Sequence, residues 1–315
     1  MRRLYITNFA GLGNRLEALT LARALQESYG GEILLDWPEL DALRVPFARF
    51  GRLPLFDRWR SRRVRNCDEA QFAALREESS ILLRGLHGPP DRMRGLYLRA
   101  MSALRLRRDL KDAVERMFQS VGARPVVGVH LRRGDFSAAS GAYDTTAPGS
   151  EPALPMDWVE AAMRRCLEFW RNCVFFVSAT GPEEDYARLG SNFDLFQVPV
   201  KNPYAAKWEG HGAPAHPVAD LFALACCEVV VATPLSSFSH VACNALGPPA
   251  ICLVPPQRMQ AGETTLCRLD MHGQLLADWV RAFRESMSSS PLTSDIVQER
   301  GWPRALTDWI PVFDP

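Results

Sequence analysis

Short apolar strands alternate with amphipathic helices along most of this chain, and this alternation restricts its fold more than any other feature. Leu4–Phe9 has the composition of a strand, Gly11 and Gly13 form a tight loop, and apolar side chains then recur at helical spacing over 14–28. Further strands are predicted at 32–36, 81–84, 126–131, 174–179, 193–198, 229–232 and 251–254, and further helices at 99–121, 158–170, 182–189, 218–226, 236–246 and 275–288. This pattern predicts an α/β fold with mainly parallel sheets.

Chain length and charge together indicate two domains. At roughly 100–200 residues per domain, 315 residues correspond to about two. Residues 1–124 contain 23 Lys and Arg against 15 Asp and Glu, a net charge of +8, whereas residues 125–315 contain 14 against 21, a net charge of −7. The second α/β series starts at Pro125 as well. We therefore expect two Rossmann-like domains, 1–124 and 125–315, that face each other across a cleft, with the C-terminal tail able to pack back on the first.

Composition excludes several classes of protein. The overall net charge is only +1, so no strong field would recruit nucleic acid. No apolar run approaches the roughly 20 residues of a membrane-spanning helix, and no apolar stretch of a secretory signal follows Met1. The eight cysteines lack paired CxxC spacing, and most have apolar neighbours, which indicates buried thiols in a reducing compartment. We therefore expect a cytoplasmic protein.

Three polar segments follow predicted strands and are candidates for ligand binding. Residues 9–15 form a glycine loop that opens a helix, where free amides could hold an anion; a plain strand-to-helix turn explains the loop equally well. Residues 127–135 place a histidine, two arginines and an aspartate at the end of a buried strand. The planar guanidinium of arginine can donate two parallel hydrogen bonds to a phosphate, although an internal Arg–Asp ion pair is the alternative. Residues 233–239 offer hydroxyls at a helix start, or simply a serine N-cap.

Together the three segments predict a diphosphate-binding cleft, because the carboxyl ends of strands are where α/β folds bind ligands. The phosphate-loop pattern GxxxxGK[ST] is absent, which argues against kinases and ATPases. A D-x-D pair is also absent, so no metal is expected on the diphosphate, and arginines would neutralise it instead.

At these residues the chain resembles the fucosyltransferase superfamily that includes the α1,2-, α1,6- and protein O-fucosyltransferases. The G-x-G-N-R stretch of that family is similar to residues 11–15, its H-x-R-R-x-D motif to residues 130–135, and a third shared segment to residues 220–246. The resemblance implies a GT-B fold and an inverting, metal-independent transfer from a GDP-sugar, usually GDP-fucose. Residues 44–123 and the tail from Gly262 carry no part of the resemblance.

The same resemblance implies roles for individual residues. Arg133, with Arg132 beside it, would contact the β-phosphate of the donor, and Ser236 and Ser237 would contact phosphate as well. His130 and Asp220 would lie on the guanine side, where Asp220 would accept hydrogen bonds from the base. In the first domain, Gly11, Gly13 and Asn14 would close on the diphosphate or the acceptor.

The general base is where this chain departs from the family pattern. In the α1,6-type enzymes a glutamate lies a few residues beyond the aspartate of the arginine motif, whereas Phe136–Ser140 contains no acidic residue here. Asp135, Asp144 and Glu17 remain as candidates for the group that takes the acceptor proton. The departure leaves open another GDP-activated sugar, or a non-catalytic nucleotide-sugar or glycan-binding module on the same fold.

The expected function is therefore fucosyl transfer from GDP-fucose to a glycan in polysaccharide biosynthesis, with the second domain holding the donor. The first domain, at +8, would face an anionic acceptor such as a diphosphate-linked lipid, or the acidic inner face of the membrane, which attracts basic surfaces.

Overall fold

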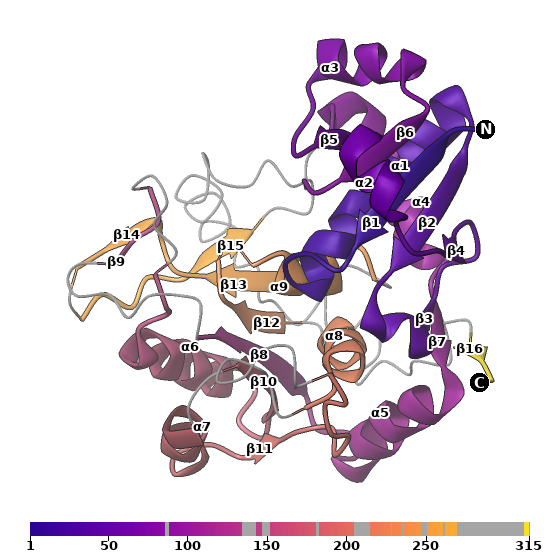
Figure 1. Ribbon diagram of the computed structural model, residues 1–315. Helices are drawn as coiled ribbons and strands as arrows, with labels where there is room; N and C mark the ends of the chain where they lie inside the picture. Colours follow the sequence, from indigo (N-terminus) through magenta and orange to yellow (C-terminus); the bar gives the residue numbers. More distant parts are fainter. Residues whose placement is uncertain are drawn as a thin grey trace. The chain divides into compact units, whose positions relative to one another are not determined.

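The structure is a computed structural model that describes residues 1–85, 88–133, 143–146, 152–180, 183–204, 215–227, 229–234, 236–246, 251–260, 262–269 and 312–314 (Figure 1). Contacts divide the chain into two compact bodies: a first unit of Met1–Lys111 with Trp309–Pro315, and a second unit of Asp112–Asp308. The division falls inside helix α5 (Arg108–Ser120), whereas Pro125 lies immediately before strand β8 (Val126–Arg132).

The first unit is built on a five-stranded parallel sheet in the order β4-β2-β1-β6-β5. Its central strands are fully buried in their apolar middles, at Leu4 and Ile6 in β1 and at Ile33 in β2, because both faces of a parallel sheet are covered. The strands are β1 (Arg3–Thr7), β2 (Glu32–Asp36), β4 (Arg49–Phe50), β5 (Arg62–Val64) and β6 (Ser80–Leu83), and the helices are α1 (Leu12–Tyr29), α2 (Leu55–Arg60), α3 (Glu69–Ala74) and α4 (Pro90–Ser102).

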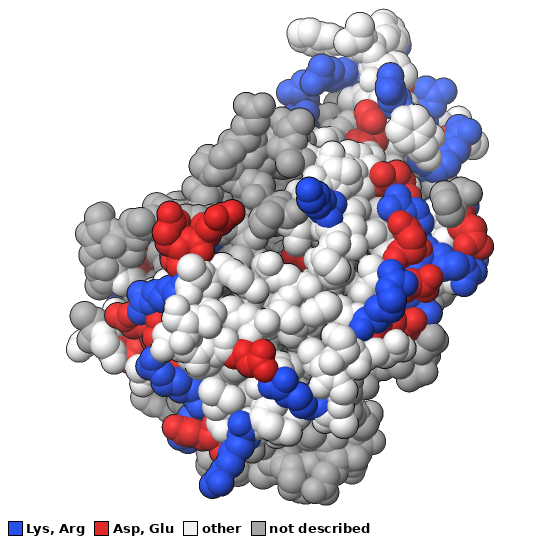
Figure 2. Space-filling model, turned by 90° about the horizontal axis from the view of Figure 1, so that it is seen from below, with Lys and Arg blue, Asp and Glu red and all other residues white. Residues whose placement is uncertain are grey.

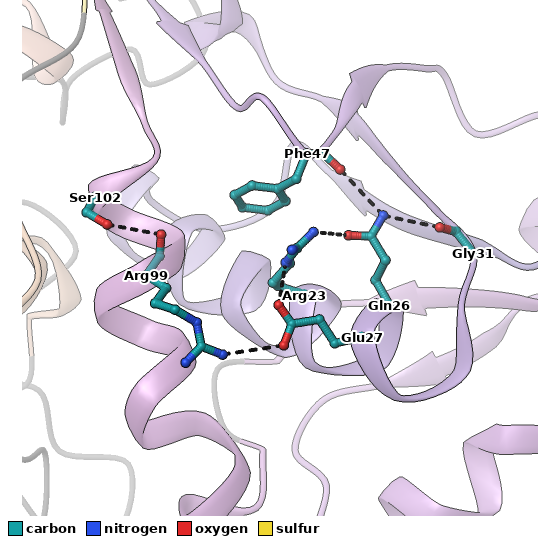
Figure 3. A network of polar contacts seen from close by, with 7 residues as sticks. All are labelled: Arg23, Gln26, Glu27, Gly31, Phe47, Arg99 and Ser102. Carbon is teal, nitrogen blue, oxygen red and sulfur yellow. Dashed lines mark hydrogen bonds and ion pairs between the residues drawn. The ribbon is translucent and has the colours of Figure 1, made fainter.

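Polar contacts fix helix α1 against its surroundings (Figure 3). Arg99 of α4 lies 3.4 Å from Glu27 of α1, and Glu27 is also paired with Arg23 one turn earlier at 2.9 Å. The Gln26 amide donates to the carbonyls of Gly31 at 3.2 Å and Phe47 at 3.5 Å. Surface pairs of this kind each contribute little energy, but together they hold the direction of the helix whose first turn carries the glycine loop.

A small sheet replaces part of an expected helix. We predicted one helix over 99–121, but α4 ends at Ser102 and α5 begins only at Arg108. Between them β7 (Arg105–Arg107) pairs with β3 (Leu43–Arg44) and with β16 (Val312–Phe313). Leu106 is fully buried in this sheet, so tertiary pairing overrides the local helical preference. The helix expected at 275–288 lies outside the described residues.

The second unit is built on a six-stranded sheet in the order β11-β10-β8-β12-β13-β15, parallel except for β15. Gly128 in β8 permits close packing here, since a Cβ at this position would lie 2.9 Å from Leu224 and 3.1 Å from Val230. Besides β8, the strands are β10 (Val174–Thr180), β11 (Leu195–Phe196), β12 (Val229–Ala232), β13 (Ile251–Val254) and β15 (Cys267–Leu269), and the helices are α6 (Met156–Phe169), α7 (Glu183–Gly190), α8 (Pro217–Ala225) and α9 (Ser237–Asn244).

The cysteines behave as apolar side chains. All eight are free and buried, as the sequence predicted. Burial raises the pKa of the Cys67 thiol to about 11, and a hydrogen bond between the Cys243 and Cys252 side chains, together with burial, raises the pKa of Cys243 well above its usual value. The thiolate forms that would act as nucleophiles or metal ligands are therefore disfavoured. Within the described part of the chain, no helix has the length and apolar character needed to cross a bilayer.

Candidate functional site

The candidate site of the second unit lies at the carboxyl ends of three adjacent parallel strands, β10, β8 and β12 (Figure 1). His130 of β8 is in register with Ser178 of β10 and with Ala232 of β12. The chain therefore brings Arg132 and Arg133, which follow His130, next to the last residues of both neighbouring strands. This edge of a parallel sheet is where α/β folds bind ligands.

Two threonines brace the arginine segment: Thr180, which sequence reasoning missed, and Thr233, the first residue of the candidate segment 233–239. The Thr180 hydroxyl accepts from the Arg133 backbone N–H at 3.0 Å, and the Thr180 carbonyl accepts from the same N–H at 3.1 Å. The Thr233 hydroxyl accepts from the Arg132 N–H at 3.0 Å and donates to the His130 carbonyl at 2.9 Å. The available signal was the dipeptide Ala-Thr, which ends β10 at residues 179–180 and spans the end of β12 at residues 232–233.

Arg133 is held by an acidic residue that the sequence did not single out. Its Nε lies 2.8 Å from Oδ2 of Asp185 in the first turn of α7, and its side chain is 16% exposed. The contact is an ion pair by distance, because the Nε–H is not aligned for a hydrogen bond. The Arg–Asp pair that we weighed as an alternative therefore forms with Asp185, while Asp135 lies outside the described residues. One carboxylate cannot use all five guanidinium N–H groups, so Arg133 retains donors for a second anion.

His130 is buried and neutral. Its ring stacks on Phe238 of α9, with 5.2 Å between centroids and an interplanar angle of 29°. Burial, assisted by the positive charge of Arg132, lowers the pKa of His130 to about 3. Its Nδ1 has no hydrogen-bond partner among the described residues. A neutral imidazole with an unused nitrogen can offer one directed hydrogen bond but no charge.

Asp220 of the second unit is a buried carboxyl group. It lies in α8, is 1% exposed, and neither carboxyl oxygen has a hydrogen-bond partner within the described part of the chain. Burial raises the pKa of Asp220 to about 7, an effect that the nearby Ser178 hydroxyl opposes. A buried polar group without partners is destabilising. Such groups concentrate at functional sites, where a ligand supplies the missing hydrogen bonds.

Ser236 does not act as the simple helix cap that we weighed as an alternative. It occupies the N-cap position of α9, yet its side chain makes no capping hydrogen bond, and its Oγ is buried without a partner among the described residues. Ser239 bonds the backbone there instead, donating to the carbonyls of Ser236 at 3.3 Å and Thr233 at 3.4 Å. Ser237 is buried in the first turn of the same helix. Both predicted serines therefore stand at a helix start, where amides favour anions.

Asn244, at the end of α9, was also missed by the sequence analysis. It is 2% exposed, and its amide oxygen and nitrogen both lack hydrogen-bond partners among the described residues.

In the first unit the glycine loop has a different geometry from the expected one. Helix α1 begins at Leu12, two residues before the predicted start, so Gly13 and Asn14 lie in its first turn. Gly11 is the N-cap residue with φ −78°, and a Cβ there would meet nothing within 4 Å. The left-handed residue is Ala10, with φ +44°, a strained conformation of the kind found at functional sites. Glu17, one turn later, is half-buried.

Arg15, the last residue of the glycine motif, forms a buried ion pair. Its Nη2 donates to Oε1 of Glu39 at 2.6 Å and its Nη1 to Oδ1 of Asn8 at 2.7 Å, and the guanidinium lies over the Trp37 ring. Arg15 and Glu39 are both almost fully buried. The pair fixes the start of α1 against the segment after β2, so we assign Arg15 to structure rather than to ligand contact. No pattern in the sequence singles out Glu39, which lies 24 residues from Arg15.

Asp144, one of the three candidates for the general base, is already engaged by neighbouring side chains. Hydrogen bonds from Thr146 and the charge of Arg258, 3.1 Å away, hold the pKa of Asp144 below its ordinary value. A carboxylate stabilised in this way is a poor proton acceptor. Among the described residues, no group of three or more His, Cys, Asp or Glu is arranged to hold a metal ion.

No protein-family model and no curated protein matches the chain. Among solved structures, fucosyltransferase NodZ from Bradyrhizobium is similar with a TM-score of 0.55 at 16% identity, covering 86% of this chain and 99% of that one. A mutant of Arabidopsis thaliana FUT1 in complex with GDP is similar with a TM-score of 0.51 at 11% identity, covering 88% and 79% of the two chains. POFUT1 in complex with GDP gives 0.50 at 12% identity, covering 80% and 98%.

These similarities establish the fold. The chain has the GT-B fold of these fucosyltransferases, so the fold class predicted from the sequence is confirmed. The solved structures that share this fold are fucosyltransferases, and at 11–16% identity the likeness is one of fold.

Proposed function

We propose that the protein is an inverting, metal-independent glycosyltransferase that moves L-fucose from GDP-fucose to a glycan acceptor. The observation that carries this proposal is the group of unsatisfied polar atoms in the second unit. Asp220, His130 and Ser236 are buried there with unused hydrogen-bonding atoms, in the unit whose sheet edge carries Arg133. Structures of NodZ, which shares the fold, were obtained with GDP and after soaking with GDP-fucose.

Each second-unit residue has a role that follows from its chemistry. Ionised Asp220 accepts from the N–H groups of guanine, which satisfies its two carboxyl oxygens and distinguishes guanine from pyrimidine bases. His130, neutral and fixed on Phe238, adds one directed hydrogen bond on the nucleotide side. Arg133, with Arg132, stabilises the negative charge that develops on the β-phosphate as GDP leaves, and Ser236 and Ser237 bind the phosphate oxygens.

The reaction couples one bond formed to one bond broken. An acceptor hydroxyl attacks the anomeric carbon as the bond from that carbon to the GDP oxygen breaks, and GDP departs with the electron pair. The acceptor proton passes to a base, for which Asp135 and Glu17 remain the candidates in this chain. Asn14 and the first-turn amides beside Gly11 and Gly13 contact the diphosphate or acceptor. The acceptor is an oligosaccharide or lipid-linked glycan of polysaccharide biosynthesis in the cytoplasm.

A second candidate function is supported by a specific feature of the sequence. Residues 136–140 carry no acidic residue beyond Asp135, so the chain could bind a nucleotide sugar or glycan without transfer, or use another GDP-activated sugar.

Release of GDP from GDP-fucose, measured with and without a panel of glycan acceptors, separates these functions. We expect acceptor-stimulated GDP release by the native protein. Arg133→Ala should lower kcat/KM by about 100-fold or more, because one lost donor to a developing charge costs roughly that much. Arg165→Ala, which removes an exposed arginine paired with Glu168 on α6, is the matched control and should leave the rate unchanged. Tight GDP binding without turnover on any acceptor would instead establish the binding module.

A further inference from the structure

Helix α2 of the first unit presents apolar side chains to solvent. Leu55, Phe56 and Trp59 are 77%, 67% and 86% exposed. Trp59 lies four residues after Leu55 and three after Phe56, so its side chain neighbours both on the helix surface, and the three form one apolar face. Single exposed apolar residues are ordinary on a protein surface, but a contiguous aromatic and aliphatic face indicates an interaction site.

Contacts with the sheet fix the direction in which this face points. Asp57 accepts hydrogen bonds from the Tyr5 hydroxyl at 2.7 Å and from Arg3 at 3.1 Å, both on β1. The Ser61 hydroxyl donates to the Asp57 carbonyl at 2.7 Å and so secures the end of the helix. The helix is therefore attached to the sheet through Asp57, and its apolar side chains are directed away from it.

Arginines without acidic partners surround the apolar face. Among the described residues, none of the exposed arginines at 52, 58, 60, 62, 63 and 65 forms an ion pair, and Arg60 lies over the Phe56 ring at 5.0 Å. Elsewhere cations and acids are commonly neighbours, as Figure 2 shows along the right-hand side of the face it draws. Asp57, the one acidic residue within 52–65, is paired with Arg3 of β1, so the six arginines leave a concentrated positive charge around the apolar face.

We propose that α2 and its flanking arginines, residues 52–65, form a surface that binds bilayers containing anionic phospholipid. A tryptophan with neighbouring aliphatic and aromatic groups suits the boundary between headgroups and acyl chains, and arginine side chains extend from there to the phosphates. Each cation near an anionic leaflet adds about 1 kcal/mol of attraction. A soluble polyanion such as a nucleic acid would satisfy the arginines but leave the apolar face in water. The bilayer is the partner that accounts for both features.

Flotation with vesicles tests this surface in the full chain. We expect binding to vesicles of equal phosphatidylglycerol and phosphatidylcholine, weaker binding as NaCl is raised from 50 to 500 mM, and little binding to phosphatidylcholine alone. Arg60→Gln with Arg63→Gln should weaken binding by about 30-fold, at roughly one factor of five per arginine. The control removes two exposed arginines elsewhere, Arg76→Gln with Arg116→Gln, and should change binding by less than about 3-fold.

The apolar face requires its own variant, because charge alone could bind vesicles nonspecifically. Phe56→Ser with Trp59→Ser should abolish binding to the mixed vesicles at 150 mM NaCl, while thermal unfolding and GDP binding stay unchanged because both side chains are exposed. Unchanged vesicle binding by this variant, or equal losses in the control pair, would overturn the proposal. If the native protein binds heparin but not vesicles, and the serine variant still binds heparin, the arginines would instead be assigned to a soluble polyanion. None of these outcomes depends on whether the protein transfers fucose.

Discussion

Replacement of Asp220 by asparagine should stabilise the free protein and weaken its binding of nucleotide. In the folded protein burial raises the pKa of Asp220 to about 7 from the ordinary value of 3.8. Between these two values the folded state keeps a proton that the unfolded state has released. Stability therefore falls as the pH rises through this window, because the unfolded state binds fewer protons than the native state.

The size of the effect follows from the two pKa values. Integrated between pH 5 and pH 8, this single group removes about 2–3 kcal/mol from the free energy of unfolding. Asparagine has nearly the same shape and does not titrate. The stability of Asp220→Asn relative to the native protein should therefore increase by about 2–3 kcal/mol over the same interval.

Urea unfolding of both proteins at pH 5, 6.5 and 8 measures this difference directly, with all other titrating groups shared. Calorimetry with GDP supplies the second readout. The GDP affinity of the native protein should rise with pH up to about 7, as Asp220 ionises, and this rise should exceed the one that ionisation of the GDP phosphate causes. The asparagine variant should bind GDP more weakly at pH 8 and lack that extra dependence. A stability difference that does not change with pH would refute the reasoning about burial, and unchanged GDP affinity at pH 8 would refute the role in base recognition.

Two further predictions concern contacts that only the folded chain forms. Thr233→Val removes a hydroxyl that accepts from the Arg132 N–H and donates to the His130 carbonyl, so GDP affinity measured by calorimetry should fall by about 10-fold or more for the two lost hydrogen bonds. An unchanged affinity would show that the segment is held without them. Glu39→Gln leaves Arg15 buried without its counter-charge and should lower the free energy of unfolding, measured in urea, by about 3–5 kcal/mol. The double variant Arg15→Met with Glu39→Leu removes both charges and should lose much less stability. A loss below about 1 kcal/mol for Glu39→Gln would count against a buried charge pair.

The elements that the sequence predicted correctly are those whose signal is local. Strands such as 126–131 and 229–232 are runs of apolar residues of the buried parallel kind, and their ends in the structure agree closely with the prediction. The helix expected at 99–121 was wrong because β7 exists only through pairing with residues 43–44 and 312–313, far away in the chain. No local pattern carries that information.

The same distinction applies to the candidate site. His130 lies near the end of a predicted strand and Arg133 and Ser236 follow strands, and the rule that ligands bind at strand carboxyl ends was enough to single them out. Their supports come from other strands and helices: Thr180 and Asp185 for Arg133, and Phe238 for His130. These contacts depend on strand order, which a single sequence does not specify. Burial without partners, the property that distinguishes Asp220, becomes visible only in the folded chain.

Calorimetric titration with GDP, UDP and CMP in metal-free buffer tests the central claim most directly, because that claim is recognition of a guanine diphosphate by the second unit without a metal. We predict that GDP binds at least 10-fold more tightly than UDP, that CMP binding is undetectable, and that added Mg²⁺ changes neither. A preference for UDP, or GDP binding that appears only with a divalent metal, would contradict the account.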